Sequence, residues 1–463
     1  MKTTKPLNPL DASWLYVESP DTPMHVGGLM IFELPENAAP DFFQRLFEDT
    51  REHQVFYPPW NRRLDNPHLK RPKHSWVELD DIDLDYHVRL SALPWPGGER
   101  ELGKLIARLH SHPLDLRRPP WECHVIQGLD NNRFALYVKM HHALIDGVSA
   151  MRLLGYMMAK TPEDDSLPAF WSMPPAPRPA TPPLATAAVE AVGGILDGVR
   201  RKFSSVPDLT RATRGLLRAA FNEDDPMGAP FKAPKSMLNG RITGQRRFAT
   251  QIYSIARIKT LAREAGCTLN DIVLAICGGA LRRFLLESGG LPEQSLTAGI
   301  PVSVRPSDDT EQGNAISFII ASLGTNVEDP VERLGVISAS TNQAKEHLQS
   351  LPKDVIESYT MLLMGPYILQ LLSGLGGRTR PVFNITISNV PGPQQTLYLR
   401  GAKMVANYPV SLITHGQALN ITCHGYADTL NFGFLGCRET LPHMQRIAVY
   451  TGEALEELEA LIL

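Results

Sequence analysis

The sequence predicts a mixed α/β protein built from two large domains, and three observations lead to this prediction. The chain has 463 residues, which corresponds to several domains at the usual ~100–200 residues each. Strand and helix patterns occur together in both halves of the chain. Between the halves, residues 162–184 hold eight prolines and cannot form a regular helix or a central strand. We therefore expect a first domain at residues 1–160, a linker and crossing helical segment at 161–245, and a second domain at 246–463.

The composition excludes several classes of protein. Lys and Arg number 46 and Asp and Glu 49, and the resulting net charge of −3 argues against binding to nucleic acid through a basic surface. Apolar residues make up 43% of the chain, which is typical of a folded protein. The five cysteines form no CxxC pair, which argues against a zinc site or a disulfide framework and favours a reducing compartment. Without a signal-peptide pattern or a run of ~18 apolar residues, we expect a soluble or peripheral intracellular protein.

In the first domain, residues 134–140 alternate between apolar and polar positions as a half-buried strand does. Successive side chains of a strand point to opposite faces. His142 therefore shares the face of Met140 if the strand continues that far, whereas His141 shares the face of Tyr137 and Lys139. Residues 147–158 follow with the apolar spacing of a helix.

The second domain shows the same mixture of elements. Residues 268–284 are typical of a helix, with either Thr268 or Asn270 as its N-cap. The β-branched run 382–388 predicts a strand. Near the end of the chain, residues 430–435 predict another strand and 441–461 a helix. A strand followed by a helix thus comes late in each half, which indicates two copies of one architecture with a single histidine pair.

The sequence His141-His142-x-x-x-Asp146-Gly147 is the most informative motif for chemistry. Adjacent histidines on a strand cannot both face one metal ion, and the zinc-binding spacing HExxH is absent, so we expect no metal site. A neutral imidazole suits a general base that acts on an alcohol or a thiol. Two partly buried polar histidines are the alternative interpretation, but the complete spacing favours catalysis. Asp146 is expected to pair with an arginine; the sequence leaves open which one. The candidates are Arg62, Arg63 and Arg305.

This motif is the signature of the CoA-dependent acyltransferase superfamily, which includes chloramphenicol acetyltransferase and the condensation domains of peptide synthetases. The rest of the chain resembles the bacterial bifunctional wax ester synthase/acyl-CoA:diacylglycerol acyltransferases over nearly its whole length. The matching landmarks are Pro6–Asp11, Pro23–Gly28, Pro113–Asp115, Arg118–Glu122, Asn270-Asp271, Gly313-Asn314 and Ile387–Pro393. One departure is Pro120 before Trp121, where the family pattern usually has leucine. It lies in a stretch that looks structural and bears little on catalysis.

The resemblance implies two chloramphenicol-acetyltransferase-like domains, each a mixed β-sheet with flanking helices, with the site at the domain interface. It also implies an activity in the synthesis of neutral storage lipids. A fatty acyl group moves from acyl-CoA to a long-chain alcohol, which gives a wax ester, or to diacylglycerol, which gives triacylglycerol. His142 would be the general base, and the acceptor hydroxyl would attack the thioester directly.

Other site residues follow from the same motif match. Asn270 is a candidate donor to the oxyanion of the tetrahedral intermediate, and a plain helix cap is the alternative. His141 is expected to orient the site, and Asp146 and Gly147 to be structural. Asp271 would support the local structure around Asn270.

Long apolar substrates need an apolar channel. The Met- and Leu-rich helical stretch that contains Met361 and Met364 is a candidate lining, with an ordinary core helix as the alternative. The turn with Asn389, Pro391 and Gly392 is a second candidate, although turn chemistry alone also explains its prolines and glycine.

We expect acyl-CoA as a co-substrate, no tightly bound cofactor, and a fatty alcohol or diacylglycerol as the other substrate. The expected location is cytoplasmic, with peripheral contact to the inner membrane or to lipid inclusions. The basic, partly apolar segment Arg200–Arg218 is the candidate for that contact, or else a solvated helix between the domains. Two alternative functions remain at this point. One is a condensation-like acyltransferase with a carrier-protein donor, and the other is a lipid-binding protein without catalysis.

Overall fold

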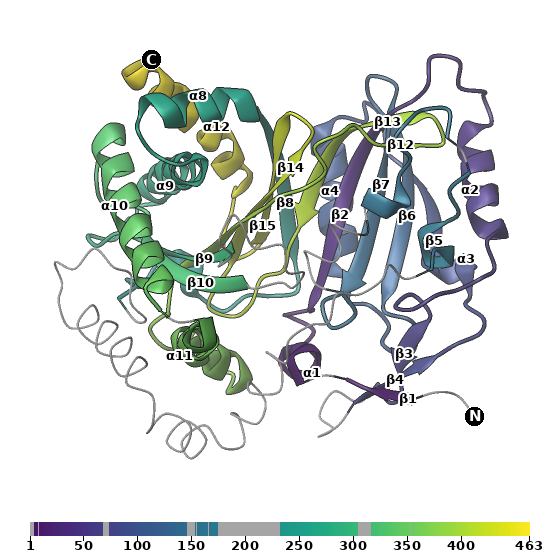
Figure 1. Ribbon diagram of the computed structural model, residues 1–463, viewed down its shortest axis with the longest axis horizontal. Coiled ribbons are helices and arrows are strands. Elements are labelled where there is room, and N and C mark those ends of the chain that lie inside the picture. The colour runs from purple at the N-terminus through teal and green to yellow at the C-terminus, as the bar shows by residue number, and fades with distance from the viewer. Residues whose placement is uncertain are drawn as a thin grey trace.

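The structure is a computed structural model that describes residues 4–463 except 8, 68–73, 146–152, 154, 165, 175–231, 304–315 and 352. Two six-stranded mixed sheets stand side by side, with helices on the outer side of each and one helix (Glu99–Ser111) between them, as Figure 1 shows, which confirms the predicted mixed α/β class. A third sheet has three short strands, β1 (Thr4–Pro6), β3 (Arg62–Leu64) and β4 (Ser75–Glu78). None of the described helices is long and apolar enough to cross a membrane.

The first sheet has the strand order β12-β13-β2-β7-β6-β5. Its strands are β2 (His25–Glu33), β5 (Val88–Ala92), β6 (Trp121–Leu129), β7 (Arg133–His141), β12 (Tyr398–Leu399) and β13 (Ala402–Val410). Its helices are α1 (Pro9–Val17), α2 (Phe42–Glu52), α3 (Leu84–His87) and α4 (Glu99–Ser111), and the short turn η1 (Phe170–Ser172) follows. Strand β7 lies between β2 and β6 and is antiparallel to both, so its carboxyl end meets the amino ends of its neighbours.

The alternation predicted for residues 134–140 is confirmed. Phe134, Leu136, Val138 and Met140 all belong to the apolar cluster on one face of the sheet, together with the buried Trp60, Trp121 and Trp171. Tyr137 belongs to a second cluster on the opposite face, which continues into the second half of the chain. The strand ends at His141, so His142 lies in the turn beyond it. Of the helix predicted at 147–158, the structure describes only residues 153 and 155–157 as helical.

The second sheet has the order β10-β9-β11-β14-β15-β8. Its strands are β8 (Arg246–Ser254), β9 (Thr297–Ser303), β10 (Ile316–Ser322), β11 (Ile385–Val390), β14 (Leu419–Tyr426) and β15 (Thr429–Cys437). Its helices are α8 (Ile255–Glu264), α9 (Leu269–Glu287), α10 (Pro330–Gln349), α11 (Lys353–Leu372) and α12 (Gln445–Ile462), and the short turn η2 (Met237–Asn239) precedes them. The strand and helix predicted near the end of the chain correspond to β15 and α12.

Strand β11 begins at Ile385, three residues later than the sequence predicted. We attribute the late start to Asn384, whose buried side chain is hydrogen-bonded to other segments of the chain. Its Oδ1 accepts a hydrogen bond from the Thr297 N–H at 2.9 Å, and its Nδ2 donates to the Pro234 carbonyl and to the Asn239 Oδ1, each at 2.7 Å. Val382 and Phe383 are buried ahead of the strand rather than within it.

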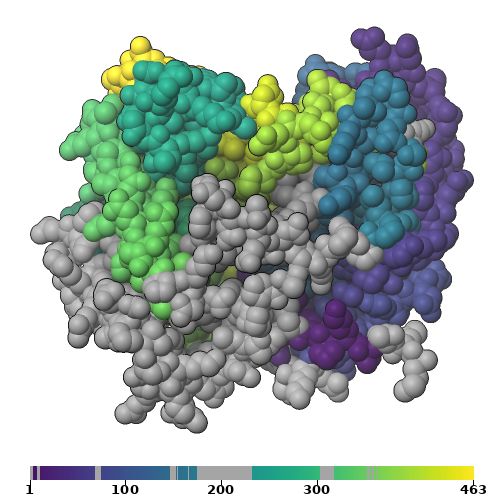
Figure 2. All heavy atoms as spheres, viewed as in Figure 1, coloured from purple at the N-terminus to yellow at the C-terminus, as the bar shows by residue number. Residues whose placement is uncertain are grey.

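The chain crosses between the two sheets in its second half. Strand β13 pairs with β2, so residues 402–410 belong to the first sheet although they follow β11 of the second. In the space-filling view, the yellow-green residues of this region fill the seam between the two lobes (Figure 2). The backbones of β13 and β15 come close there, because Gly433 leaves space for the Pro409 carbonyl. The domain limits expected from the sequence remain a prediction. They do not take into account that β13, from the second half of the chain, joins the first sheet.

We expect the substitution Gly433→Ala to destabilise the protein. A Cβ at this position would lie 1.8 Å from the Pro409 carbonyl oxygen, so the two strands would have to separate. Overpacking of this kind lowers the free energy of unfolding by about 1–3 kcal/mol, which thermal or denaturant unfolding would measure. Gly425→Ala is the matched control, because its Cβ would have no neighbour closer than 3.7 Å. Equal stability of the two variants would contradict this description of the seam.

Candidate active site

The two histidines lie at the carboxyl end of β7, and the backbone holds them from both sides. The His141 N–H donates to the Pro120 carbonyl at 2.9 Å, and the His142 N–H donates to the Met24 carbonyl at 2.8 Å. His141 also pairs with His25 in the register of β7 and β2. The turn that carries both histidines is thus fixed by the residues before β6 and before β2.

The side chain of His141 is fully buried and bonded through both ring nitrogens. Nδ1 accepts a hydrogen bond from the Ala143 N–H at 3.0 Å, and Nε2 lies 2.6 Å from a carboxylate oxygen of Glu18. Because Nδ1 accepts, the ring proton is on Nε2 and is donated to Glu18. These two bonds fix the tautomer and the orientation of the ring. The arrangement suits the orienting role expected for His141.

His142 is half-buried, and its ring lies against Trp14 of α1. The two ring centroids are 4.1 Å apart at an interplanar angle of 31°. Helix α1 also contacts α11, the helix with Met361 and Met364. Helix α1 thus contacts both the candidate base, through Trp14, and the methionine-rich helix.

A layer of buried polar groups lies on the face of the sheet that His141 shares. His25 donates from Nε2 to the His110 carbonyl at 2.8 Å, and Lys139 donates to the Leu109 and His112 carbonyls at 3.1 and 3.0 Å. These carbonyls lie in the last turn and at the C-cap of α4, where carbonyls lack intrahelical donors, so side chains of the strands β2 and β7 cap this helix.

The charge of Lys139 has a buried partner in Glu122, with 3.2 Å between the ammonium and the carboxylate. Burial acts to raise the pKa of Glu122, but the hydrogen bond with His124 and the charges of Lys139 and Arg89 outweigh it and hold this pKa at about 2. Burial is also the main cause that lowers the pKa of Lys139. Lys139 and Glu122 therefore compensate each other's buried charge. Removal of either one would leave a lone buried charge, which is strongly destabilising.

His110 joins the first sheet to the chain beyond β13. Its Nε2 donates to the Ser411 carbonyl at 2.7 Å, and its Nδ1 accepts from the Tyr137 hydroxyl at 2.7 Å. Burial, with the nearby charge of Lys139, lowers the pKa of His110 to about 3. The neutral ring is thus a fixed contact between the two halves of the chain, next to the candidate site.

Asn270 lies at the second position of α9 and is half-buried. The N-cap of this helix is Thr268, so the interpretation of Asn270 as a plain helix cap is wrong. Asp271 closes the capping box, and its other oxygen accepts from the Thr341 hydroxyl at 2.6 Å. This supports the local structure around Asn270 as expected. No hydrogen bond joins Asn270 to either histidine within the part of the chain that the structure describes.

The turn with Asn389, Pro391 and Gly392 lies where the two halves meet. Asn389 is in β11 and pairs with Cys423 of β14, and Val390 packs against the apolar cluster of the first sheet. Pro391 is exposed and Gly392 is half-buried. This turn therefore lies at the domain interface, where the resemblance puts the site.

Some predicted site residues lie outside the described residues, and others have partners away from the histidines. Asp146, Gly147, Arg305, Gly313, Asn314 and the segment 200–218 are outside the described residues, as is the side chain of Met361. Met364 is half-buried in α11 and packs against the larger core. Arg62 is paired with Glu78 at 2.7 Å, and Arg63 donates to the Leu64 carbonyl.

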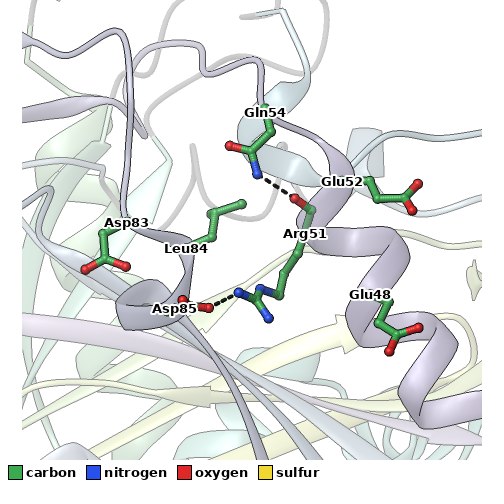
Figure 3. A pocket seen from close by; sticks show the side chains of 7 residues that line it. All are labelled: Glu48, Arg51, Glu52, Gln54, Asp83, Leu84 and Asp85. Carbon is green, nitrogen blue, oxygen red and sulfur yellow. Dashed lines mark hydrogen bonds and ion pairs between the residues drawn. The ribbon is translucent and has the colours of Figure 1, made fainter.

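A cavity of about 520 Å³ lies between α2 and α3, away from the histidines. Figure 3 shows its lining side chains, which include Glu48, Glu52, Asp83 and Asp85. Arg51 pairs with Asp85 across it. Its polar, charged lining does not fit a fatty chain, so the channel expected from the resemblance is not this cavity.

Sequence reasoning missed the role of Glu18 and of Trp14, although both lie close to the N-terminal landmark Pro6–Asp11. The residues have no spacing relation to the histidine motif, which is more than 120 positions away. Only the packing of α1 against the end of β7 brings them there. Lys139 was seen as a strand residue, but its partner Glu122 was not.

Two mixed sheets with paired histidines at the end of a central strand define a class, the two-domain acyltransferase fold of condensation domains. The first condensation domain of the calcium-dependent antibiotic synthetase superposes with a TM-score of 0.59 over 99% of this chain and 96% of its own, at 15% identity, so the likeness is in fold alone. The chloramphenicol-acetyltransferase-like fold class expected from the sequence is thereby confirmed.

More specific matches follow. The catalytic-domain model of wax ester synthase/diacylglycerol acyltransferase matches residues 7–273, and the C-terminal domain model of that family matches 312–459. The Marinobacter aquaeolei wax ester synthase/diacylglycerol acyltransferase structure has a TM-score of 0.78 and 37% identity, over 99% of this chain and all of that one. A putative diacylglycerol O-acyltransferase of Mycobacterium tuberculosis is 48% identical over 99% of this chain and 98% of its own length. O-acyltransferase WSD of Acinetobacter baylyi is 36% identical over 99% of this chain and 98% of its own length. The chain belongs to the wax ester synthase/diacylglycerol acyltransferase family, which confirms the resemblance.

We expect Glu18→Ala to lower kcat by about 10–100-fold, the range seen when a partner that fixes a metal-bound histidine is removed. Without the carboxylate, the Nε2 proton of His141 loses its acceptor and the turn before His142 loses its anchor. The KM for palmitoyl-CoA should change little, because Glu18 acts through His141. Steady-state CoA release measures both constants. Glu18→Gln keeps an acceptor oxygen and should lose less; a full rate in Glu18→Ala would contradict this positioning role.

Stability should fall as the pH is lowered from about 6.5 to about 4. Burial lowers the pKa of His87 and of His424 to about 4, so between these values the unfolded chain binds protons that the folded protein does not. Each such histidine contributes up to ~1.4 kcal/mol per pH unit to this loss. Unfolding curves at several pH values measure it. His424→Leu should show a smaller dependence than the unchanged protein, and an identical dependence would contradict the assignment.

Proposed function

We propose that His142 is the general base of an O-acyltransferase that moves a long-chain acyl group from acyl-CoA to a fatty alcohol or to diacylglycerol. The observation that carries the proposal is the position of this imidazole. It lies in a turn fixed by the Met24 carbonyl and by the buried His141, at the edge of the domain interface. A rigid, half-buried imidazole is well placed to take a proton from a hydroxyl group.

The reaction is a direct transfer. A ring nitrogen of His142 takes the proton of the acceptor hydroxyl while the oxygen forms a bond to the thioester carbonyl carbon. When the tetrahedral intermediate collapses, the C–S bond breaks and the leaving sulfur takes the proton from the imidazolium. The products are the ester and free CoA. The base is neutral again after each turnover.

Three of the five described cysteines, Cys123, Cys277 and Cys423, are unsuited to form an acyl-enzyme. Burial raises the pKa of Cys123 and of Cys277 to about 12, so their thiolates are rare at neutral pH. Cys423, in the strand beside Asn389, has a pKa raised by the same cause. A buried thiol with a raised pKa is a poor nucleophile.

Asn270 is proposed as a donor to the oxyanion. Its place in the first turn of α9 puts it at the positive end of a helix dipole, where developing negative charge is stabilised. The rigid capping box formed by Thr268 and Asp271 would hold it in place. Asp146 and Gly147 are proposed as structural residues of the same site, and Met361, Met364 and the Asn389–Gly392 turn as lining of the substrate channel.

We further propose that the protein takes its lipid substrates from a membrane or a lipid inclusion by peripheral contact. Leu369 and Leu375, at the end of α11, are 52% and 44% exposed. Apolar side chains at such a position lie easily in a lipid surface. A carrier-protein donor is the weaker alternative, because the likeness to condensation domains is in fold alone.

The unchanged protein should release CoA from palmitoyl-CoA when hexadecanol or dipalmitoylglycerol is present, and His142→Ala should lose about 10²–10⁴-fold in rate. Thin-layer chromatography identifies the ester, and the ratio of the two acceptors gives the substrate preference. Asn270→Ala in the same assay should lose ~10²–10³-fold. His53→Ala, at the end of α2, is the control and should keep the full rate. A folded His142→Ala protein with undiminished transfer would refute the base assignment.

A further inference from the structure

Three arginines surround His415 at the junction of the two halves: Arg241, Arg246 and Arg378. Arg241 Nη2 lies 2.9 Å from the Nε2 of His415, and the Ile242 N–H lies 3.2 Å from its Nδ1. A neutral imidazole has one nitrogen that accepts and one that donates. Only one of these two donors can therefore be satisfied by the ring. The group, which we call the arginine cluster, holds more donors than acceptors.

Arg246 adds a buried positive charge to this excess of donors, because this residue is only 3% exposed. Its guanidinium donates to two backbone carbonyls, those of Thr243 and of Asp21, the latter at 2.8 Å. Burial lowers its pKa to about 10. Among the described residues no carboxylate forms an ion pair with it. A buried positive charge without a counter-ion is destabilising, so an anion at this place would be strongly favoured.

Glycines bring the exposed members of the cluster together. Gly377 has φ 74°, and a Cβ on it would lie 2.8 Å from the backbone nitrogen of Arg241. The neighbouring Arg378 is therefore held close to Arg241. Both side chains are on exposed residues, and neither forms an ion pair within the described ranges. Many other arginines have one, for example Arg62 with Glu78 and Arg257 with Glu459.

The charge around His415 has little compensation. Burial lowers its pKa most, and the charges of Arg241, Arg246 and Arg378 lower it further, whereas the carboxylate of Asp21 acts in the opposite direction. The site is thus a concentration of positive charge, and its members Arg241 and Arg378 are exposed to a ligand. Arginine forks match the geometry of phosphate oxygens.

One loop links the cluster to the candidate active site. Residues 18–24 contact His141 through Glu18 and His142 through the Met24 carbonyl. The same loop accepts the hydrogen bond from Arg246 through the Asp21 carbonyl. The two histidines therefore contact the ends of this seven-residue loop and the cluster contacts its middle, close enough for one extended ligand to reach both.

We propose that the arginine cluster binds the phosphate groups of acyl-CoA, so that the pantetheine arm extends along the 18–24 loop toward His142. This inference rests on the proposed function, since it assumes an acyl-CoA donor. A CoA molecule carries a pyrophosphate and a 3′-phosphate, which offers several anionic groups to several cations. A lipid headgroup presents the same phosphate chemistry, but the link to the histidines favours the donor nucleotide.

Binding of CoA to the full-length protein, followed by calorimetry at low salt, tests this directly. Arg378→Gln and Arg241→Gln should each raise the Kd of CoA about tenfold, which corresponds to ~1.4 kcal/mol. Both should reduce the dependence of the Kd on salt. In the transfer assay the KM for palmitoyl-CoA should rise while kcat at saturation stays near that of the unchanged protein. Arg45→Gln, an exposed arginine of α2 paired with Asp41, is the control.

Each outcome has one meaning. An unchanged Kd of CoA in folded Arg378→Gln and Arg241→Gln, or no binding of CoA by the unchanged protein, overturns the inference. So does a loss of binding to vesicles with 20 mol % phosphatidylglycerol while CoA affinity is kept, since the phosphate would then be a headgroup. Weaker CoA binding in the variants supports the inference even if no acceptor is acylated, and in that case the proposed transfer reaction alone fails.

Discussion

The end of strand β7 is the constraint on which the rest of the structure depends. The strand is bonded on both sides, by β2 and by β6, so its last residue cannot shift along the sheet. One face of the strand is apolar. The other face carries Tyr137 and Lys139, which are both bonded to α4, and His141, which is bonded to Glu18 just after α1. A slip by one residue would move the ammonium of Lys139 into the apolar cluster. The position of the turn with His142 follows from this register.

The buried polar layer connects that strand to the second half of the chain. Lys139 and His25 hold the carboxyl end of α4, and α4 in turn packs against β8. His110, on the last turn of α4, reaches the Ser411 carbonyl beyond β13. The two halves therefore meet through fixed hydrogen bonds as well as through the larger apolar core. A site built between them inherits this rigidity, which general-base catalysis requires.

The sequence was sufficient for the class of fold, for the alternation in β7 and for the helix that begins after Thr268, because each depends on a local periodicity. It was also sufficient to find the histidine pair, because the motif from His141 to Gly147 is one contiguous stretch of the chain. It could not reveal that Glu18 is the partner of His141, since the two are 123 positions apart and only tertiary packing brings them together. The late start of β11 had the same origin. The side chain of Asn384 bonds to β9 and to residues 234 and 239, and no pattern of neighbouring residues records such contacts.

The strand exchange at β13 has a consequence for how the protein can be divided. Because residues 402–410 complete the first sheet, a fragment that stops near residue 160 would expose the whole edge of β2 to solvent. Such a fragment would be prone to associate through that open edge. A cut between residues 174 and 232 would instead leave two pieces that hold each other by a shared sheet. The halves are therefore one cooperative unit, and shuffling of either half among relatives has to carry the β2–β13 pairing with it.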